Sequence, residues 1–325
     1  MLVLSRADLA RLLEPRAVIR AVETAFREQA AGRVRALPRA AMPMSDDALF
    51  LTMTSSLPRR RALGTKLVTV VPGNRRRGLP TLHASYVLSD PDTGRPAAFL
   101  EAGFLTGIRT GATSALAARH LARRDSHVVT CFGAGFQAGF QLQCLAAALP
   151  VRRVAVVGRD PARARAFARR MQGLLGVPVA VAEDARAAVR AADVVTLATT
   201  SNRPVLRGRD LRPGTHVDAV GAFRPTTREV DTETVRRARV VVDTYEGCWA
   251  EAGDVLLPIR EGAIGRRHVV AELGQVVSGR RAGRRSAREI TLFKSVGYAP
   301  EDAVTARLAV DLARRRRLGR EVDLS

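Results

Sequence analysis

The chain has 325 residues, a formal net charge of +22, 46% hydrophobic residues and 26% charged residues. This length and composition exclude disordered and fibrous classes and allow two domains that each bury a core. The opening MLVLSRADLARLLEP contains charged residues, and no later segment approaches the roughly 18 unbroken apolar residues of a membrane helix. We therefore expect a cytoplasmic protein without a membrane span.

The excess of basic residues would ordinarily favour a polyanionic partner such as a nucleic acid. However, the arginines are spread along the whole chain, aromatic residues make up only 4%, and no nucleic-acid motif accompanies them. Lys66 and Lys294 are the only lysines, so much of the charge reflects a preference for arginine at the surface. We therefore do not expect a nucleic-acid function.

The cysteines Cys131, Cys144 and Cys248 stand in apolar surroundings without paired spacing. This pattern is typical of reduced thiols and resembles neither a disulfide framework nor a zinc site. We expect no bound metal.

The first third of the chain predicts two helices followed by an antiparallel meander. Apolar residues recur at helical spacing over residues 6–31. Strands are expected at ALFLTMTSS, GTKLVTVV, LHASYVLSD and PAAFLEAG, with turn residues at 72–74 and 91–94. A helix, TSALAARHLARR, comes next, so we expect a helical domain border near residues 110–126.

From His127 onward, predicted strands alternate with predicted helices. The strands are HVVTCF, RRVAVVG, VPVAVA, ADVVTLAT, HVDAVG and ARVVVDT. This alternation is typical of a doubly wound parallel sheet. The fold class is therefore α/β: a Rossmann-type doubly wound parallel sheet plus a second α+β domain with an antiparallel meander.

The segment HVVTCFGAGFQAGFQL contains a glycine pattern at a strand-to-helix switch. Gly133 permits the tight turn, Gly135 lets the backbone approach phosphates, and Ala138 keeps helix and strand close. Together with Ala134, these residues predict a dinucleotide site, the alternative being a purely structural turn. A preceding strand, a following helix and further βα units favour the dinucleotide site.

The end of the second strand, VAVVGRDPARARAF, bears on which dinucleotide binds. Gly158 occupies the position where an acid would bind the ribose hydroxyls of NAD, and Arg159 stands beside it. Asp160 could supply that acid, but Asp160 followed by Pro161 is typical of a helix N-cap. Arg159 is then available for a 2′-phosphate, so we favour NADP(H) over NAD(H).

Several blocks in order make the chain resemble the ornithine cyclodeaminase and mu-crystallin family. They are GTKLVTVVPGN, GIRTGATSALAARHL, FGAGFQA, HVDAVGAFRPTTREVD, EAGDVLLP, AELGQVVSG and EITLFKSVGYAPEDAVTARLA. The resemblance implies a homodimer in which a Rossmann domain binds a nicotinamide cofactor and a second domain binds an amino or imino acid. We expect the substrate-binding and dimerisation domain to comprise residues 1–112 and 306–325, and the Rossmann domain residues 113–305.

The resemblance also implies substrate-binding residues. Arg39 and Arg109 match the family's carboxylate-binding positions, and arginine suits a carboxylate because its planar fork donates two parallel hydrogen bonds. Lys66 shares a strand face with Gly64 and Val68, so the pattern points its side chain to a buried side. By resemblance its partner is the substrate, with Lys66 binding the carboxylate or assisting proton transfer, and burial would lower its pKa usefully. The alternative is a lysine at a strand end that reaches solvent.

One departure from the family concerns the loop GAFRPTTRE. Cyclodeaminases of the family carry an aspartate where this chain has Phe223, so proton handling in a cyclodeaminase is put in doubt. The string resembles instead the mu-crystallin and ketimine reductase branch. We assign Phe223 and Arg224 to substrate binding, with a core phenylalanine as the alternative for Phe223.

Further cofactor contacts are implied by the resemblance alone, and Lys294 is expected to come back toward the nicotinamide with its neighbour Ser295. Arg109 is assigned to the cofactor as well as to the substrate. The additional cofactor positions are Thr81, Thr110, Phe136, Gln137, Thr199, Val220 and Ser295.

The resulting functional hypothesis is an NAD(P)H-dependent imine (ketimine) reductase that acts on a cyclic or acyclic α-imino acid. Lys66 is the candidate catalytic residue. The alternatives are an ornithine or lysine cyclodeaminase that uses bound NAD, and a non-catalytic cofactor-binding protein of the mu-crystallin type.

Overall fold

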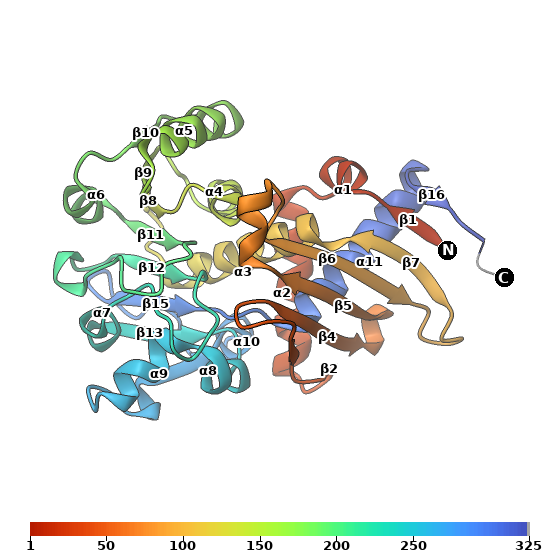
Figure 1. Cartoon of the computed structure of the whole chain (residues 1–325). Coiled ribbons are helices and arrows are strands. Elements are labelled where there is room, and N and C mark those ends of the chain that lie inside the picture. The colour runs from red at the N-terminus through yellow and green to blue at the C-terminus, as the bar shows by residue number, and fades with distance from the viewer. Residues whose placement is uncertain (324–325) are drawn as a thin grey trace. The chain divides into compact units, whose positions relative to one another are not determined.

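The computed structural model describes residues 1–323, which form two compact units (Figure 1). Unit 1 contains Met1–Arg109 and residues 298–323, and unit 2 contains Thr110–Gly297. The sequence places these borders at 112/113 and 305/306. The second border lies earlier in the structure because helix α11 (Ala299–Arg316) packs as a whole on the helices and strands of unit 1.

Unit 1 is a sheet of eight strands in the order β16-β1-β7-β6-β5-β4-β2, with β3 paired to β4. The predicted meander is confirmed, because β4, β5, β6 and β7 pair in sequence as antiparallel neighbours. The short β1 was not predicted, and it runs parallel to β7. The elements are β1 (Leu2–Leu4), α1 (Arg6–Leu12), α2 (Pro15–Ala30), β2 (Arg35–Ala36), β3 (Ala40–Pro43), β4 (Leu49–Leu57), β5 (Ala62–Val70), β6 (Leu82–Ser89), β7 (Pro96–Glu101), α11 and β16 (Arg320–Glu321).

One face of this sheet is buried by helices. Helix α11 packs on β4, β5 and β6 and also on α2. The predicted periodicity of α2 is confirmed, since Val18, Ile19, Val22 and Phe26 are all buried. Burial alternates along β5, so Ala62, Gly64, Lys66 and Val68 share the buried face. The strand pattern therefore fixes the direction of Lys66, as predicted.

Helix α3 begins earlier than predicted, at Ala102, and runs to Leu121. Its first turn is capped by Glu101, whose two carboxylate oxygens accept the N–H groups of Gly103 at 2.7 Å and Phe104 at 2.9 Å. The predicted helix began at Thr113, since the glycines at 103, 107 and 111 have low helix propensity. Arg109 consequently lies within this helix.

Unit 2 is a doubly wound sheet of eight strands in the order β10-β9-β8-β11-β12-β15-β13-β14. Every neighbouring pair is parallel, and the strand order reverses between β8 and β11. The predicted fold class is confirmed, although β14 and β15 were not predicted. The strands are β8 (Val128–Phe132), β9 (Arg153–Val157), β10 (Val179–Val181), β11 (Val194–Leu197), β12 (His216–Ala219), β13 (Ala238–Val242), β14 (Val269–Glu272) and β15 (Ile290–Lys294).

Helices cover both faces of this sheet in Figure 1, and an apolar cluster lies on each face. Two-sided burial explains why the strands are continuous apolar runs instead of alternating ones. The helices of unit 2 are α4 (Phe136–Ala148), α5 (Pro161–Leu175), α6 (Ala185–Ala191), α7 (Thr232–Arg237), α8 (Tyr245–Glu251), α9 (Gly253–Arg260) and α10 (Leu273–Val277), after the larger part of α3.

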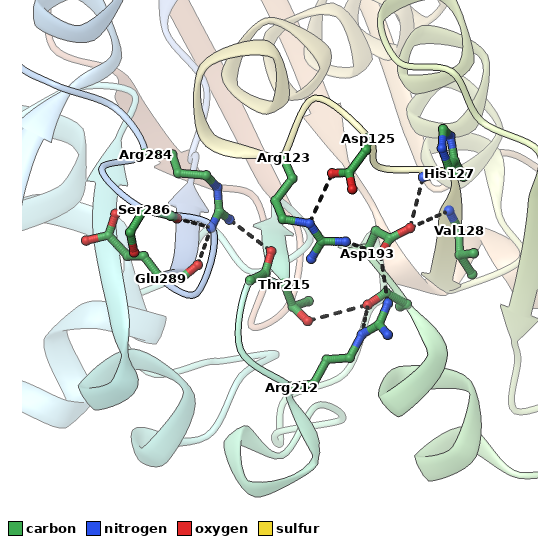
Figure 2. Close-up of polar contacts among 12 residues, drawn as sticks. Arg123, Asp125, His127, Val128, Asp193, Arg212, Thr215, Arg284, Ser286 and Glu289 are labelled. Atoms are coloured by element: carbon green, nitrogen blue, oxygen red, sulfur yellow. Dashed lines mark hydrogen bonds and ion pairs between the residues drawn. The ribbon is translucent and has the colours of Figure 1, made fainter.

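Asp193 ties the amino-terminal ends of β8 and β11 together (Figure 2). Its Oδ2 accepts the N–H groups of His127 at 2.9 Å and Val128 at 3.0 Å, and its Oδ1 accepts from Arg123 at 2.6 Å and Arg212 at 2.7 Å. Burial alone would raise the pKa of Asp193, but the two backbone N–H donors and Arg123 outweigh it and lower the pKa. Asp193 is therefore a structural carboxylate, at the sheet edge opposite the carboxyl ends of the strands.

Candidate functional site

The glycine turn after β8 has the geometry that a bound pyrophosphate requires. Gly133 has φ +109°, and a β-carbon there would lie 2.6 Å from the carbonyl oxygen of Ala198. Gly135 is the N-cap of α4, and a β-carbon there would meet no atom within 4 Å. Ala138 is fully buried against the sheet. The turn leaves open space at a helix N-terminus, where unsatisfied N–H groups favour phosphate, so these residues fit a dinucleotide.

The turn after β9 contains two charged residues, Arg159 and Asp160, of which Asp160 makes local hydrogen bonds there. Asp160 is the N-cap of α5, and its Oδ1 accepts the N–H groups of Ala162 at 2.9 Å and Arg163 at 3.1 Å. The predicted N-cap is thus present, with Pro161 at the first helical position. Arg159 is exposed directly after β9, next to Gly158. The arginine is therefore accessible to a ligand, whereas one carboxylate oxygen of Asp160 is engaged locally.

Three other predicted cofactor positions follow strands of the same sheet. Thr199, Val220 and Ser295 come after β11, β12 and β15, so all three lie at the carboxyl edge with the glycine turn. The hydroxyl of Ser295 is buried and donates to Asp243 at 2.8 Å. Phe136 is 46% exposed and packs edge-on against Phe140, and Gln137 is half-buried in the same first turn of α4.

Lys294 ends β15, and its side chain has partners within unit 2. Its ammonium is buried, lies 2.8 Å from a carboxylate oxygen of Asp254 and donates to the carbonyl of Ala222. A buried ammonium needs such partners because isolated charge is costly in the interior. Lys294 therefore belongs to the interior of unit 2.

Unit 1 brings two of the predicted substrate residues into one buried ion cluster. Lys66 on β5 donates to Asp302 Oδ2 at 2.7 Å. Arg109 on α3 donates to Asp302 Oδ1 at 3.0 Å and to Glu301 Oε2 at 2.7 Å. Each of these side chains is at most 5% exposed. Glu301 and Asp302 lie in the first turn of α11, so three elements of unit 1 meet at this cluster.

The environment of the cluster changes the proton affinity of Lys66. Burial lowers its pKa to about 7, the nearby charge of Arg109 acts in the same direction, and Asp302 opposes both. For Arg109, burial would lower the pKa, but the carboxylates of Asp302 and Glu301 outweigh it and raise the pKa. Lys66 can therefore exchange a proton near neutral pH, whereas Arg109 keeps a permanent charge.

Arg39 precedes β3, is half-buried and adds its charge to the same region, since it also lowers the pKa of Lys66. Three cations and two carboxylates give the cluster a formal charge of +1 when Lys66 is protonated. An ammonium has three donor hydrogens. Over residues 1–323, Asp302 is the acceptor described for Lys66, so further donors remain for an anion.

The other predicted residues are not part of this cluster. Phe223 and Arg224 belong to the loop after β12 in unit 2, where Phe223 packs against the apolar core. Thr81 lies in unit 1 before β6, and its carbonyl accepts the N–H of Val71. Thr110 is the first residue of unit 2, within α3.

Three residues near Lys66 were missed from the sequence. Glu301 and Asp302 were missed because acids in a first helical turn are already explained by the helix dipole. Tyr86 is paired with Lys66 across β5 and β6, and its buried hydroxyl has no hydrogen-bond partner among residues 1–323. Tyr86 was hidden in a strand pattern that an aromatic residue fits anyway.

The structure also describes the cysteines, the side chains that could bind a metal, and the length and polarity of the helices. Cys131, Cys144 and Cys248 are free and buried, and burial raises the pKa of each thiol. No cluster of three potential metal-ligating His, Cys, Asp or Glu side chains occurs within residues 1–323. None of the helices in this range combines the length and apolar character needed to cross a bilayer.

Comparison with known proteins gives matches along nearly the whole chain. A sequence model of the ornithine cyclodeaminase/mu-crystallin family matches residues 1–316. Delta(1)-pyrroline-2-carboxylate reductase of Bacillus cereus is 37% identical over 325 residues, which cover 99% of this chain and 100% of the relative.

Two solved structures are similar over their full length. The structure of Delta(1)-pyrroline-2-carboxylate reductase of Thermococcus litoralis, in complex with NADH and L-proline, has a TM-score of 0.97 at 41% identity, covering 99% of this chain and 100% of that one. An archaeal alanine dehydrogenase dimer with bound NAD has a TM-score of 0.94 at 32% identity, covering 100% and 99%.

Proposed function

Because the chain belongs to the ornithine cyclodeaminase/mu-crystallin family, we propose that it reduces Δ1-pyrroline-2-carboxylate or a closely similar cyclic α-imino acid with a reduced nicotinamide cofactor. The chain is thus an NAD(P)-dependent oxidoreductase acting on C=N bonds, as its full-length relatives indicate. The observation that carries the substrate class is the buried Lys66–Asp302–Arg109 cluster. Such a cluster suits a small carboxylic acid.

Unit 2 holds the dinucleotide in this proposal. The N–H groups at the start of α4 receive the pyrophosphate beyond Gly133, Ala134 and Gly135, and Ala138 permits the close packing behind them. Thr199 and Val220 line the same edge of the sheet. When bound, the reduced nicotinamide supplies the hydride that the imine carbon accepts.

Unit 1 holds the substrate carboxylate. Lys66 offers its remaining donors, and Arg109 and Arg39 provide permanent positive charge beside it. A bound carboxylate offsets the formal charge of +1 that these side chains share with Glu301 and Asp302. Phe223 and Arg224, in the loop after β12, remain proposed substrate contacts.

Reduction of an imine adds a hydride to carbon and a proton to nitrogen. Lys66 is the proposed proton source, because its pKa of about 7 allows it to give up a proton near neutral pH. The carboxylate of Asp302 favours the protonated ammonium and so opposes the lowering of the Lys66 pKa by burial and by Arg109. Solvent then reprotonates the amine.

The preference for NADP(H) over NAD(H) is a separate proposal that depends on Arg159. This arginine is exposed after β9, where an acidic residue would otherwise bind the ribose hydroxyls. The capping role of Asp160 supports it, since one of its two carboxylate oxygens is engaged by α5. Two relatives were solved with NADH or NAD bound, which lack the 2′-phosphate, so the choice of cofactor in this chain depends on Arg159.

We also propose a homodimer formed through unit 1. The sheet face opposite Lys66 presents apolar side chains: Leu67 is 37% exposed and Phe99 is 36% exposed. An alanine dehydrogenase of similar structure is a dimer. Light scattering should give the mass of two chains.

The test of the proposed reaction is a substrate panel followed by the absorbance of the reduced cofactor. We expect NADH or NADPH to be consumed with Δ1-pyrroline-2-carboxylate or Δ1-piperideine-2-carboxylate, and L-proline or L-pipecolate to appear. Release of ammonia from L-ornithine without net cofactor consumption would favour a cyclodeaminase instead. Cofactor binding without turnover of any imino acid would favour a non-catalytic binding protein.

A further inference from the structure

Glu229 is a buried carboxylate that joins two loops at the carboxyl edge of the unit 2 sheet. Its Oε1 accepts from the backbone N–H and the hydroxyl of Thr199, both at 2.7 Å. Its Oε2 accepts the N–H groups of Gly221 at 2.6 Å and Ala222 at 3.3 Å. Thr199 follows β11 and Gly221 follows β12, and these strands are parallel neighbours. One carboxylate therefore fixes the ends of two adjacent strands.

The two loops approach each other so closely that position 221 has no room for a side chain. A β-carbon on Gly221 would lie 2.4 Å from the carbonyl oxygen of Thr199 and 2.5 Å from Glu229 Oε1. Any larger residue at this position would push the loops apart or displace the carboxylate. The distance between the loops is therefore set by the hydrogen bonds of Glu229 and by the absence of a β-carbon at Gly221.

Glu229 is itself held by a second layer of buried charge. Asp254 Oδ1 accepts the N–H groups of Glu229 at 2.7 Å and Val230 at 3.0 Å. Lys294, at the end of β15, lies 2.8 Å from Asp254 Oδ2 and donates to the carbonyl of Ala222. Glu229, Asp254 and Lys294 are each at most 1% exposed. The brace therefore connects the ends of three parallel strands.

We infer that Glu229 is a positioning residue for the nicotinamide half of the dinucleotide: it sets the affinity for that half without touching it. In a doubly wound sheet, the strands on either side of the reversal hold different halves of the dinucleotide. The glycine turn and Arg159 follow β8 and β9, whereas the loops fixed by Glu229 follow β11 and β12. This inference rests on the proposed cofactor site, in which Thr199 and Val220 contact the cofactor.

Two variants separate the charge of Glu229 from its reach. Glu229→Gln keeps the length but turns an amide N–H toward backbone N–H donors, which breaks one side of the brace. Glu229→Asp keeps the charge but is one methylene shorter and cannot reach both loops. Glu233→Gln is the matched control, because Glu233 lies nearby on α7 and pairs at the surface with Arg236.

The experiment compares the dissociation constants of NADH and ADP, measured by calorimetry well below the unfolding temperature of each variant. ADP occupies only the half of the site at β8 and β9, so it reports on that half alone. We expect both Glu229 variants to weaken NADH binding by roughly tenfold or more, the usual scale for buried donors left without a partner. ADP binding should stay within about twofold of wild type, and Glu233→Gln should match wild type for both ligands.

Each other outcome is informative. If wild type binds neither NADH nor NADPH, the proposed function fails first; if it binds NADPH alone, NADPH replaces NADH in the same comparison. If wild type binds NADH and both Glu229 variants bind it equally well, only the positioning role is overturned. Parallel losses of ADP and NADH affinity would also overturn it, since they indicate general damage to unit 2. Should Glu229→Gln fail to fold, Glu229→Asp decides.

Discussion

Lys66 and Asp302 are 236 positions apart in the sequence, yet their side chains form a buried ion pair of 2.7 Å. The pair joins β5 to the first turn of α11, and Arg109 binds the second oxygen of the same carboxylate. Two cations thus share one acid in the interior of unit 1. This arrangement is the basis for the substrate site and for the following predictions.

Replacing Lys66 with methionine should lower turnover of an imino acid on the order of 10²-fold or more, the scale expected for loss of acid-base assistance. Folding should persist, because Arg109 still neutralises Asp302. Steady-state kinetics and NADH binding should be measured on the same preparation. Unchanged kinetics would remove Lys66 from the mechanism.

The pH dependence of kcat/KM should show the ionisation of Lys66. Its pKa is lowered to about 7, so the protonated fraction falls as pH rises through this value. If the ammonium donates the proton, kcat/KM should decline above about pH 7 with a slope of one proton. Asp302→Asn should move this decline to lower pH, because it removes the carboxylate that favours the ammonium.

Lys66→Arg is the control for that pH profile. A guanidinium stays protonated throughout the range, so the declining limb should disappear even if overall activity is lower. If the limb remains in Lys66→Arg, the titrating group is the substrate imine or another residue, and the assignment to Lys66 is wrong.

Arg159→Ala should distinguish the two cofactors. Removing a guanidinium that binds a 2′-phosphate should weaken NADPH by on the order of tenfold or more and leave NADH nearly unchanged. Arg169→Ala is a suitable control, since Arg169 is also exposed but lies further along α5, away from the turn after β9. Equal effects of Arg159→Ala on both cofactors would refute the 2′-phosphate assignment.

Asp193→Ala should destabilise unit 2 by about 2 kcal/mol or more, because two backbone N–H groups and two arginines lose their acceptor. Asp125→Ala is the control: Asp125 also pairs with Arg123 but is 75% exposed, and should change stability by less than about 0.5 kcal/mol. Urea unfolding at neutral pH provides the comparison.

The pH dependence of the Asp193 effect has a definite sign. The folded state lowers the pKa of this carboxyl group, so its stabilisation is present above the ordinary carboxyl pKa of roughly 3.9. That stabilisation is lost as pH falls through the folded pKa. The difference between wild type and Asp193→Ala should therefore shrink in acid, and a constant difference would contradict the ionised assignment.

Local patterns were sufficient to predict the glycine turn, the meander and the direction of Lys66. The turn at Gly133 was predictable because only a few residue types allow a strand to turn tightly into a helix beside a phosphate. The direction of Lys66 was predictable because side chains alternate along a strand. The N-cap at Asp160 followed from its neighbour Pro161.

The partners of the buried charges could not be predicted from local sequence patterns. Asp302 meets Lys66 only after α11 returns to the sheet of unit 1, and no local pattern records such a long-range contact. Likewise, the sequence does not show that Asp254 lies beside Lys294. The start of α3 was missed because a carboxylate cap at Glu101 outweighs the low helix propensity of three glycines.

The proposed hydride transfer can be followed with NADH or NADPH that carries deuterium at the transferable position of the nicotinamide. Supplied with Δ1-pyrroline-2-carboxylate, the enzyme should form L-proline with deuterium at Cα when one of the two labelled faces is used. Mass spectrometry of the product gives the answer. Proline without deuterium from both labelled forms, or no proline at all, would contradict a nicotinamide-dependent imine reductase.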